Sequence, residues 1–274
     1  MASPNRYWYN GQLIISDVLA LPPQDPGLLF GATVFTTLRV YEQNLDHPWT
    51  AWAAHLQRTA RSLQAFHWLE PHWERVRYGA DQLVQQYPVL RVTIFPDGRE
   101  LIVGRSLPPD LATLQTAGVT AWVAESEDYH RSLPGHKTGN YLSCWLSLQT
   151  AKRHQAQEAI LVNEQGHWLE TSTGNLWGWA EGQWYTPPLA DGILPGVMRS
   201  RVIQGLQENH QTLHITPWDV DQVTRLSYLA YTNSVMGVIP IHTVLQVTAS
   251  VNYNPDQGKI QQLTQAWQVV APEI

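Results

Sequence analysis

EAILVNEQGHWLETSTGNLWGWAEGQWYTPP, residues 158–188, is the stretch of sequence that decides the fold. It is a series of short apolar segments separated by brief polar turns, one of which contains Gln165-Gly166. Short segments rich in aromatic and β-branched residues and bounded by turn residues indicate strands. Because these strands follow one another at close intervals, we predict an antiparallel or barrel-like sheet.

Helices and further strands surround this stretch. Residues 119–124 predict a strand, and residues 141–154 predict a helix between it and the sheet. Beyond the sheet, residues 196–210 predict a helix that opens after Pro195-Gly196, and QQLTQAWQVVAP (261–272) predicts a closing helix. Helix and strand are therefore mixed in an α+β pattern.

The N-terminal part has its own pattern of strands and helices. Asn10-Gly11 lies inside YWYNGQLII, which is a hairpin signal. Apolar residues recur at helical spacing from Trp52 to Leu69. The remaining predicted elements are a strand at 33–41, a helix at 74–87, and paired strands at 89–95 and 100–104.

We expect two domains joined by a linker. SLPPDLATLQTAG (106–118) contains paired prolines, is polar, and separates two strand-rich regions. The predicted division is a smaller N-terminal α/β domain (1–110), a linker (111–120), and a larger C-terminal domain with a barrel-like sheet (121–274).

Composition narrows the classes of function. With 274 residues and 43% hydrophobic residues, the chain can bury a sizeable core. Its net charge of −6 disfavours nucleic acid and anionic lipid as partners. A single cysteine, Cys144, excludes an internal disulfide, and the scattered histidines predict no metal site. No apolar run is long enough for a membrane helix, so we expect a cytoplasmic protein.

Lysines are scarce, which makes one of them conspicuous. Only three of the 17 basic residues are lysines, and Lys152 and Lys259 lie in polar surroundings. Lys137 lies between Gly135 and Gly139, with an apolar segment after it. A lysine in such a setting suits Schiff-base chemistry, and the alternative is a loop lysine in solvent.

Other residues are candidates for a bound anion or a cationic ring. Glu170 ends a strand and enters a loop of small residues, where it either holds a cationic ring nitrogen or caps a turn. Arg58 lies on the first long helix, where it either binds phosphate or is solvated. The helix that opens at Gly196 offers backbone N–H groups to an anion.

Six segments in register resemble the fold-type IV family of pyridoxal-phosphate-dependent enzymes. This family includes branched-chain aminotransferases, D-amino-acid aminotransferases and 4-amino-4-deoxychorismate lyases. The resemblance runs from about residue 10 to residue 241, and its segments are DPGLLFGATVFTTLRVY, HLQRTARSL, HKTGNYL, LETSTGNLW, GILPGVMR and TNSVMGVIPI. It implies a two-domain fold like that of the D-amino-acid aminotransferases.

The resemblance implies a role for individual residues around pyridoxal 5'-phosphate. Lys137 stands where the family lysine bonds covalently to the cofactor, and Glu170 stands where a carboxylate pairs with the pyridine nitrogen. Tyr141 stands where the aminotransferases of the family often place a tyrosine against the ring's 3-oxygen, a position that varies among the lyases. The implied phosphate-binding residues are Arg58 of the HxxR pattern, the backbone of Val197 and Met198, and Ser234. The resemblance also implies a homodimer.

Within the family, three features favour the lyase. They are Phe35-Thr36-Thr37, where aminotransferases more often have an acid after the aromatic residue, Met198 in GVMR, and the segment 233–236 (NSVM). The resemblance then implies an aminodeoxychorismate lyase that makes 4-aminobenzoate and pyruvate for folate biosynthesis. The alternatives are an aminotransferase of branched-chain or D-amino acids and a non-catalytic binding protein with the same fold.

The substrate-facing edge departs from the lyases. They often have an SRG-containing, glycine-rich loop where this chain has TIFPDGRELIVGR (93–105). No carboxylate-binding residue is therefore assigned from the resemblance. The arginines that remain candidates are Arg39, Arg91, Arg99 and Arg105.

Overall fold

The computed structural model describes residues 5–246 and 249–269 and divides the chain into two compact units. The first unit comprises the described residues up to Pro108 together with residues 136–141. The second unit comprises Pro109–Gly135 and the described residues from Leu142 onward. The helix predicted at 261–272 has its last three residues outside the described residues.

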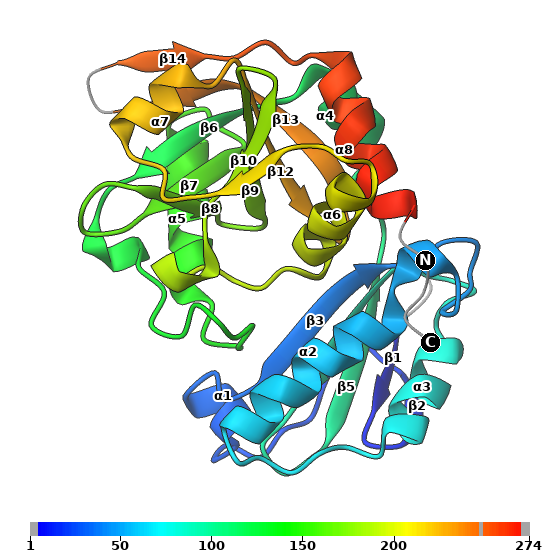
Figure 1. Ribbon diagram of the computed structural model, residues 1–274. Coiled ribbons are helices and arrows are strands. Elements are labelled where there is room, and N and C mark those ends of the chain that lie inside the picture. Colours follow the sequence, from blue (N-terminus) through cyan, green and yellow to red (C-terminus); the bar gives the residue numbers. More distant parts are fainter. Residues whose placement is uncertain (1–4, 247–248, 270–274) are drawn as a thin grey trace. The chain divides into compact units, whose positions relative to one another are not determined.

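The first unit is built on a five-stranded antiparallel sheet of order β2-β1-β5-β4-β3 (Figure 1). Its elements are β1 (Arg6–Tyr9), β2 (Gln12–Ile15), α1 (Pro26–Leu29), β3 (Val34–Arg39), η1 (Pro48–Thr50), α2 (Trp52–Ala65), α3 (Trp73–Asp81), β4 (Val89–Ile94) and β5 (Glu100–Arg105). The predicted hairpin is confirmed: Asn10 and Gly11 have φ of 44° and 84°. Two consecutive positive φ angles are what a two-residue turn of type I′ requires.

Helices α2 and α3 cover one face of this sheet. Leu38 of β3, Val92 of β4 and Ile102 of β5 lie in one core with Leu63 of α2 and Val76 of α3, and all five are fully buried. Burying one such side chain contributes about 1.5–3 kcal/mol. Because side chains alternate along a strand, the neighbouring residues of β3 and β4 point to the opposite face of the sheet.

The second unit contains the predicted barrel. Its elements are α4 (Leu111–Ala117), β6 (Val119–Ala124), η2 (Glu127–Tyr129), α5 (Leu142–Arg153), β7 (Glu158–Val162), β8 (Trp168–Thr171), β9 (Asn175–Ala180), β10 (Gln183–Thr186), η3 (Leu189–Asp191), α6 (Val197–Glu208), β11 (Leu213–Ile215), α7 (Val220–Arg225), β12 (Tyr228–Asn233), β13 (Gly237–Leu245), β14 (Ser250–Asn252) and α8 (Gln257–Val269). The strands follow the order β11-β10-β9-β12-β13-β6-β7-β8, and the pairing of β8 with β9 closes six of them into a barrel-like sheet.

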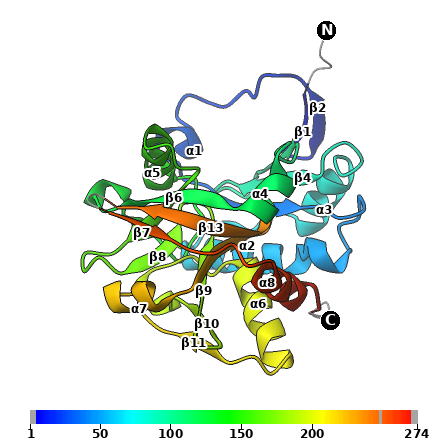
Figure 2. The same ribbon diagram turned by 90° about the horizontal axis from the view of Figure 1, so that it is seen from above.

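The barrel is mixed and not wholly antiparallel. Strand β6 pairs in parallel with both β7 and β13, and β10 pairs in parallel with β11. The cause for β6 and β7 is the helix α5 between them, because parallel neighbours need a crossover connection. Helices α6 and α8 lie side by side (Figures 1 and 2). Trp177, Trp184 and Trp218 are fully buried in this unit.

The boundary between the units differs from the predicted one in two respects. Residues 111–117 of the predicted linker form helix α4, and residue 119 begins β6. Residues 136–141, placed by the sequence in the C-terminal domain, group with the first unit. The reason is backbone pairing with β3 and its approach, since Phe35 N–H donates to Lys137 O (2.8 Å) and Gly139 N–H donates to Thr33 O (2.7 Å).

Within residues 5–246 and 249–269, no helix has both the length and the apolar character needed to cross a membrane.

Candidate active site

Lys137 is held at the β3 edge of the first unit's sheet. Strand β3 is the last strand of that sheet, and residues 136–141 continue the pairing beyond it, with a β-bridge between Val34 and Thr138. His136, one residue earlier, lies with Nδ1 2.9 Å from the hydroxyl of Ser62 on α2. The backbone on both sides of Lys137 is therefore fixed to the first unit, although the residues before 136 and after 141 belong to the second.

Two aromatic rings surround the Lys137 amine. Its Nζ donates to the Tyr141 hydroxyl at 3.4 Å. The same atom lies 5.0 Å from the centre of the Phe35 ring and 4.9 Å from that of Tyr141. The two rings meet edge to face, with centroids 5.6 Å apart. The structure thus brings together two of the residues predicted from the sequence, Lys137 and Tyr141.

The sheet face that bears Phe35 is basic. Arg39 lies on it by alternation, Arg91 is opposite Thr37, and Arg105 is opposite Val89, the partner of Arg39. This face is the one that α2 and α3 do not cover. In the part of the chain that the structure describes, none of these three arginines forms an ion pair with a carboxylate.

Arg91 is the arginine of this face that lies against the site. Its guanidinium stacks 3.5 Å from the centre of the Phe35 ring. Burial, helped by the nearby charge of Arg105, lowers the pKa of Arg91 to about 10, so it remains a cation at neutral pH. A largely buried guanidinium with no carboxylate partner among the described residues is suited to bind an anion.

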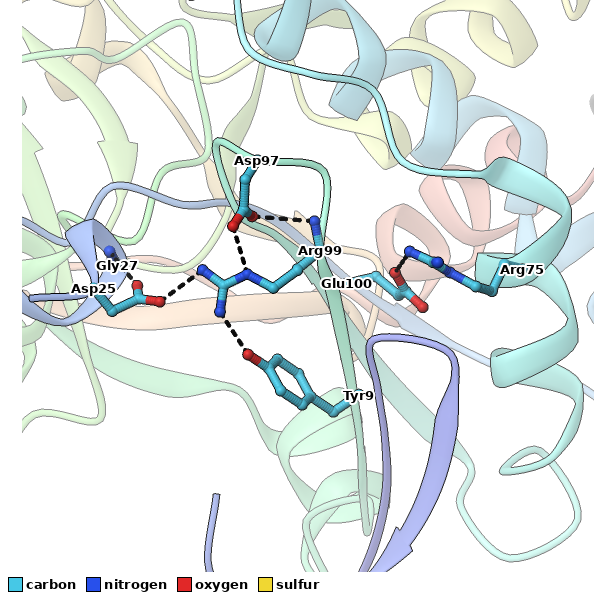
Figure 3. Close-up of polar contacts among 7 residues, drawn as sticks. All are labelled: Tyr9, Asp25, Gly27, Arg75, Asp97, Arg99 and Glu100. Carbon is cyan, nitrogen blue, oxygen red and sulfur yellow. Dashed lines mark hydrogen bonds and ion pairs between the residues drawn. The ribbon is translucent and has the colours of Figure 1, made fainter. Parts of the chain in front are cut away.

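Arg99, also a candidate, is engaged elsewhere (Figure 3). It donates to Asp25 at 2.7 Å, to Asp97 at 2.6 Å and to the Tyr9 hydroxyl at 2.6 Å. Burial would raise the pKa of Asp25, but hydrogen bonds from Arg99 and from the Gly27 N–H outweigh it and lower that pKa. Arg99 therefore fixes the loop before α1 to the turn between β4 and β5.

Arg58 extends from α2 toward the opposite, helix-covered side of β3. Its Nη2 donates to the Thr36 hydroxyl at 2.8 Å, and that hydroxyl lies 2.6 Å from Nδ1 of His55. Thr36 and His55 are 0% and 1% exposed. The guanidinium of Arg58 is thus oriented by two buried residues.

In the second unit, Glu170 of β8 is a buried carboxylate with several donors. Its Oε1 accepts from Nη1 of Arg131 at 2.5 Å, and its Oε2 accepts from the Leu194 N–H at 3.1 Å and from Nδ2 of Asn175 at 3.3 Å. Glu170 is 4% exposed. An adjacent guanidinium favours the charged form of a carboxylate, so Glu170 is suited to pair with a cationic ring nitrogen.

The start of α6 is joined to Glu170 through Asn175. The Asn175 amide also donates to Leu194 O at 3.0 Å, and a Cβ on Gly196 would overlap its Oδ1. Gly196 precedes the helix without a side-chain cap. The first N–H groups of α6, at Val197 and Met198, have no partner within the helix, so they are suited to donate to an anion.

Ser234 lies in the turn that follows β12. The side chain of Asn233 holds this turn, since its Oδ1 accepts from the N–H groups of Val235 (3.0 Å) and Met236 (2.8 Å). Within the described residues, no group of three or more His, Cys, Asp or Glu is arranged to hold a metal ion.

The structure adds residues that sequence reasoning did not single out. Arg131 and Asn175 contact Glu170, and His55 contacts Arg58 through Thr36, a residue that the sequence analysis noted only as a subfamily feature. His55 could have been found from the sequence, because it is the first residue of the HxxR pattern that contains Arg58. Arg131 had none, since 39 positions separate it from Glu170.

The sequence is similar to known proteins along most of its length. Residues 33–244 match the model of the family described as amino-transferase class IV. The chain is 24% identical over 251 residues to the aminodeoxychorismate lyase of Vibrio harveyi, which covers 86% of this chain and 90% of that one. It is 24% identical over 227 residues to the branched-chain-amino-acid aminotransferase of Salmonella typhimurium, with 73% and 72% covered. Its fold resembles that of a hypothetical aminotransferase from Mycobacterium tuberculosis in PLP-bound form, with a TM-score of 0.79, 20% identity, and 96% and 98% covered.

Proposed function

Because the chain belongs to the class IV aminotransferase family, whose cofactor is pyridoxal 5'-phosphate, we propose that it is an aminodeoxychorismate lyase. The reaction converts 4-amino-4-deoxychorismate into 4-aminobenzoate and pyruvate, a step of folate biosynthesis. The similarity to the lyase of Vibrio harveyi, over 86% of this chain, supports the proposal. The observation that carries it is Arg91, a half-buried cation with no carboxylate partner in the described chain, stacked on the same Phe35 ring that the Lys137 amine approaches.

The residues present fit the cofactor. Lys137 supplies an amine for its aldehyde, and the buried carboxylate of Glu170 supplies a partner for its ring nitrogen. Tyr141 supplies a hydroxyl for the ring's 3-oxygen. The uncapped start of α6 offers donors to its phosphate. The residues that would hold the phosphate are Arg58, Ser234 and the backbone of Val197 and Met198.

Bound pyridoxal phosphate supplies an electron sink for the carbon that bears the substrate's amino group. Glu170 would hold a proton on the ring nitrogen, and the adjacent guanidinium of Arg131 favours the charged form of Glu170 that this role requires. Lys137 moves protons at Nζ: it takes the proton from the amine-bearing carbon and returns one to the departing enolpyruvyl group. The products balance the substrate atom for atom, so no oxo acid is consumed.

Arg91 holds a substrate carboxylate. The proposed substrate has two carboxylates, and the basic face formed by Arg39, Arg91 and Arg105 matches that charge. A branched-chain amino acid has one carboxylate and an apolar side chain, so it would leave most of this face without a partner. The charge of the face therefore favours the lyase over the aminotransferase.

The first experiment asks whether the cofactor binds at Lys137. The purified protein should be yellow, and borohydride should remove the colour and leave the reduced label on Lys137. Lys137→Ala should bind no label, whereas Lys152→Ala, at the exposed end of α5, should behave as the wild type. A colourless protein that takes up no cofactor would favour a non-catalytic binding protein.

The second experiment separates the lyase from the aminotransferase. The protein is mixed with 4-amino-4-deoxychorismate without any oxo acid, and pyruvate and 4-aminobenzoate are measured. Equal amounts of both are expected. Amino-group exchange with 2-oxoglutarate, with no pyruvate released from 4-amino-4-deoxychorismate, would instead identify an aminotransferase of branched-chain or D-amino acids.

The third experiment tests Arg91 directly. Arg91→Met should lower kcat/KM by about 100-fold, mostly through KM, because a charge-assisted pair with the substrate is lost. Arg61→Met, an exposed arginine of α2, is the matched control and should change neither constant. An unchanged KM in Arg91→Met would remove Arg91 from the site.

We also propose that two copies of the chain associate. Val18, Leu28 and Phe30 of the first unit are 71%, 60% and 73% exposed, which is a large apolar surface for one short segment. Light scattering on the purified protein should give twice the mass of one chain. Phe30→Glu should shift that mass toward one chain.

A further inference from the structure

Thr36 lies between Arg58 and His55 and is hydrogen-bonded to both. Arg58 is a donor only, so at 2.8 Å the Thr36 oxygen must accept its hydrogen bond. The hydroxyl proton of Thr36 is then available to the His55 ring, whose Nδ1 lies 2.6 Å away. When the Thr36 hydroxyl donates to Nδ1, the hydrogen bonds run from Arg58 to Thr36 to His55.

This direction of the hydrogen bonds corresponds to one tautomer of the His55 ring. If Nδ1 accepts the Thr36 proton, the ring is neutral and carries its proton on Nε2. His55 and Arg58 are one turn apart on α2, so both face β3 together. His55 is further fixed at its backbone, where its carbonyl accepts from the hydroxyl of Thr59 at 3.0 Å.

Burial makes this arrangement specific. Thr36 and His55 are 0% and 1% exposed, so water does not replace either partner. A buried hydroxyl that loses its partner bears the full cost of desolvation. The guanidinium of Arg58 is therefore confined to the position that Thr36 sets for it.

We propose that Thr36 and His55 are positioning residues that set the affinity of Arg58 for the cofactor's phosphate. This inference rests on the proposed function, because it takes Arg58 as a phosphate-binding residue. It assigns a role to the threonine that follows Phe35, in the place where many aminotransferases of the family have an acid. A neutral hydroxyl orients the guanidinium without placing a negative charge beside it.

The test compares two probes that differ only in the phosphate. Pyridoxal phosphate and pyridoxal are titrated into the full chain freed of cofactor, and each dissociation constant is read from the absorbance of the lysine-bound form. The ratio of the two constants measures what the phosphate contributes. Effects on Lys137 or on the ring cancel in this ratio.

Two matched pairs of variants address the two residues. Thr36→Val removes the hydroxyl at constant shape, and Thr36→Ser retains it. His55→Gln lacks an acceptor near Nδ1, and His55→Asn places its amide oxygen there. Thr50→Val, which removes another buried hydroxyl of the first unit, is the control.

We expect Thr36→Val and His55→Gln to reduce the preference for pyridoxal phosphate by about tenfold, the order of one hydrogen bond to a charged group. Thr36→Ser, His55→Asn and Thr50→Val should preserve it. An unchanged ratio in Thr36→Val and His55→Gln, or equal weakening of both probes, would overturn the positioning role alone. A wild-type chain that binds neither probe would overturn the proposed function itself.

Discussion

Replacing Arg131 by methionine should destabilise the second unit, because it leaves the Glu170 carboxylate buried without its cation. The side chains of Arg131 and Glu170 are 11% and 5% exposed, so the pair is shielded from water. Removing one partner of a buried ion pair costs about 3–5 kcal/mol. Glu170 retains two donors, Leu194 N–H and Asn175 Nδ2, so we expect the lower end, about 3 kcal/mol.

The assay is denaturant unfolding of the cofactor-free protein followed by tryptophan fluorescence. Trp177, Trp184 and Trp218 are buried in the second unit and report its transition. A double-mutant cycle with Glu170→Gln isolates the pair: once the carboxylate is neutral, Arg131→Met should cost at least about 1 kcal/mol less. Arg153→Met, at the exposed end of α5, is the control. If the two changes add to within about 0.5 kcal/mol, the reasoning is refuted.

Three further predictions concern buried groups. Burial raises the pKa of Glu158, and hydrogen bonds from Ser172 and Thr173 offset this only in part. The contribution of Glu158 to stability therefore falls as pH rises through its folded-state pKa. Glu158→Gln should gain Tm relative to the wild type from pH 4 to pH 8, and a constant difference in Tm would contradict this. The pKa of Asp25 is lowered, so its contribution to stability is present above its unfolded-state pKa and is lost in acid. In urea unfolding, Asp25→Asn should cost about 1–2 kcal/mol at pH 7, and its stability should approach that of the wild type toward pH 3. A Cβ on Gly205 would overlap the Ala266 carbonyl oxygen, whereas Gly135 has open space around it. Measured by calorimetry, Gly205→Ala should lower the free energy of unfolding by about 1–3 kcal/mol, and Gly135→Ala should leave it unchanged.

Local pattern was sufficient for most helices and strands. The hairpin at Asn10-Gly11 needed only its turn residues, and α5 and α6 began within one residue of the predicted starts. Pattern failed where the outcome depended on distant partners. Alternation indicates a strand but not its neighbour's direction, so the parallel pairings of β6 were not foreseen.

The site shows the same limit. Lys137 could be singled out because lysines are rare and glycines flank it, and Glu170 could be singled out by its loop of small residues. Arg91 and Arg99 were equivalent in sequence, and only the carboxylates around Arg99 separate them. The ion pair between Arg131 and Glu170 joins two segments far apart in the chain, and no local signal precedes it.

The membership of residues 136–141 in the first unit makes that unit discontinuous in the gene. A shortened chain that ends at Pro108 would leave the edge of β3 without its last backbone partners and would lack Lys137 altogether. If gene segments were exchanged between relatives after residue 108, Lys137 would therefore come with the second unit, although it groups with the first. Such chimaeras must take residues 136–141 and β3 from the same parent, because the two segments pair with each other.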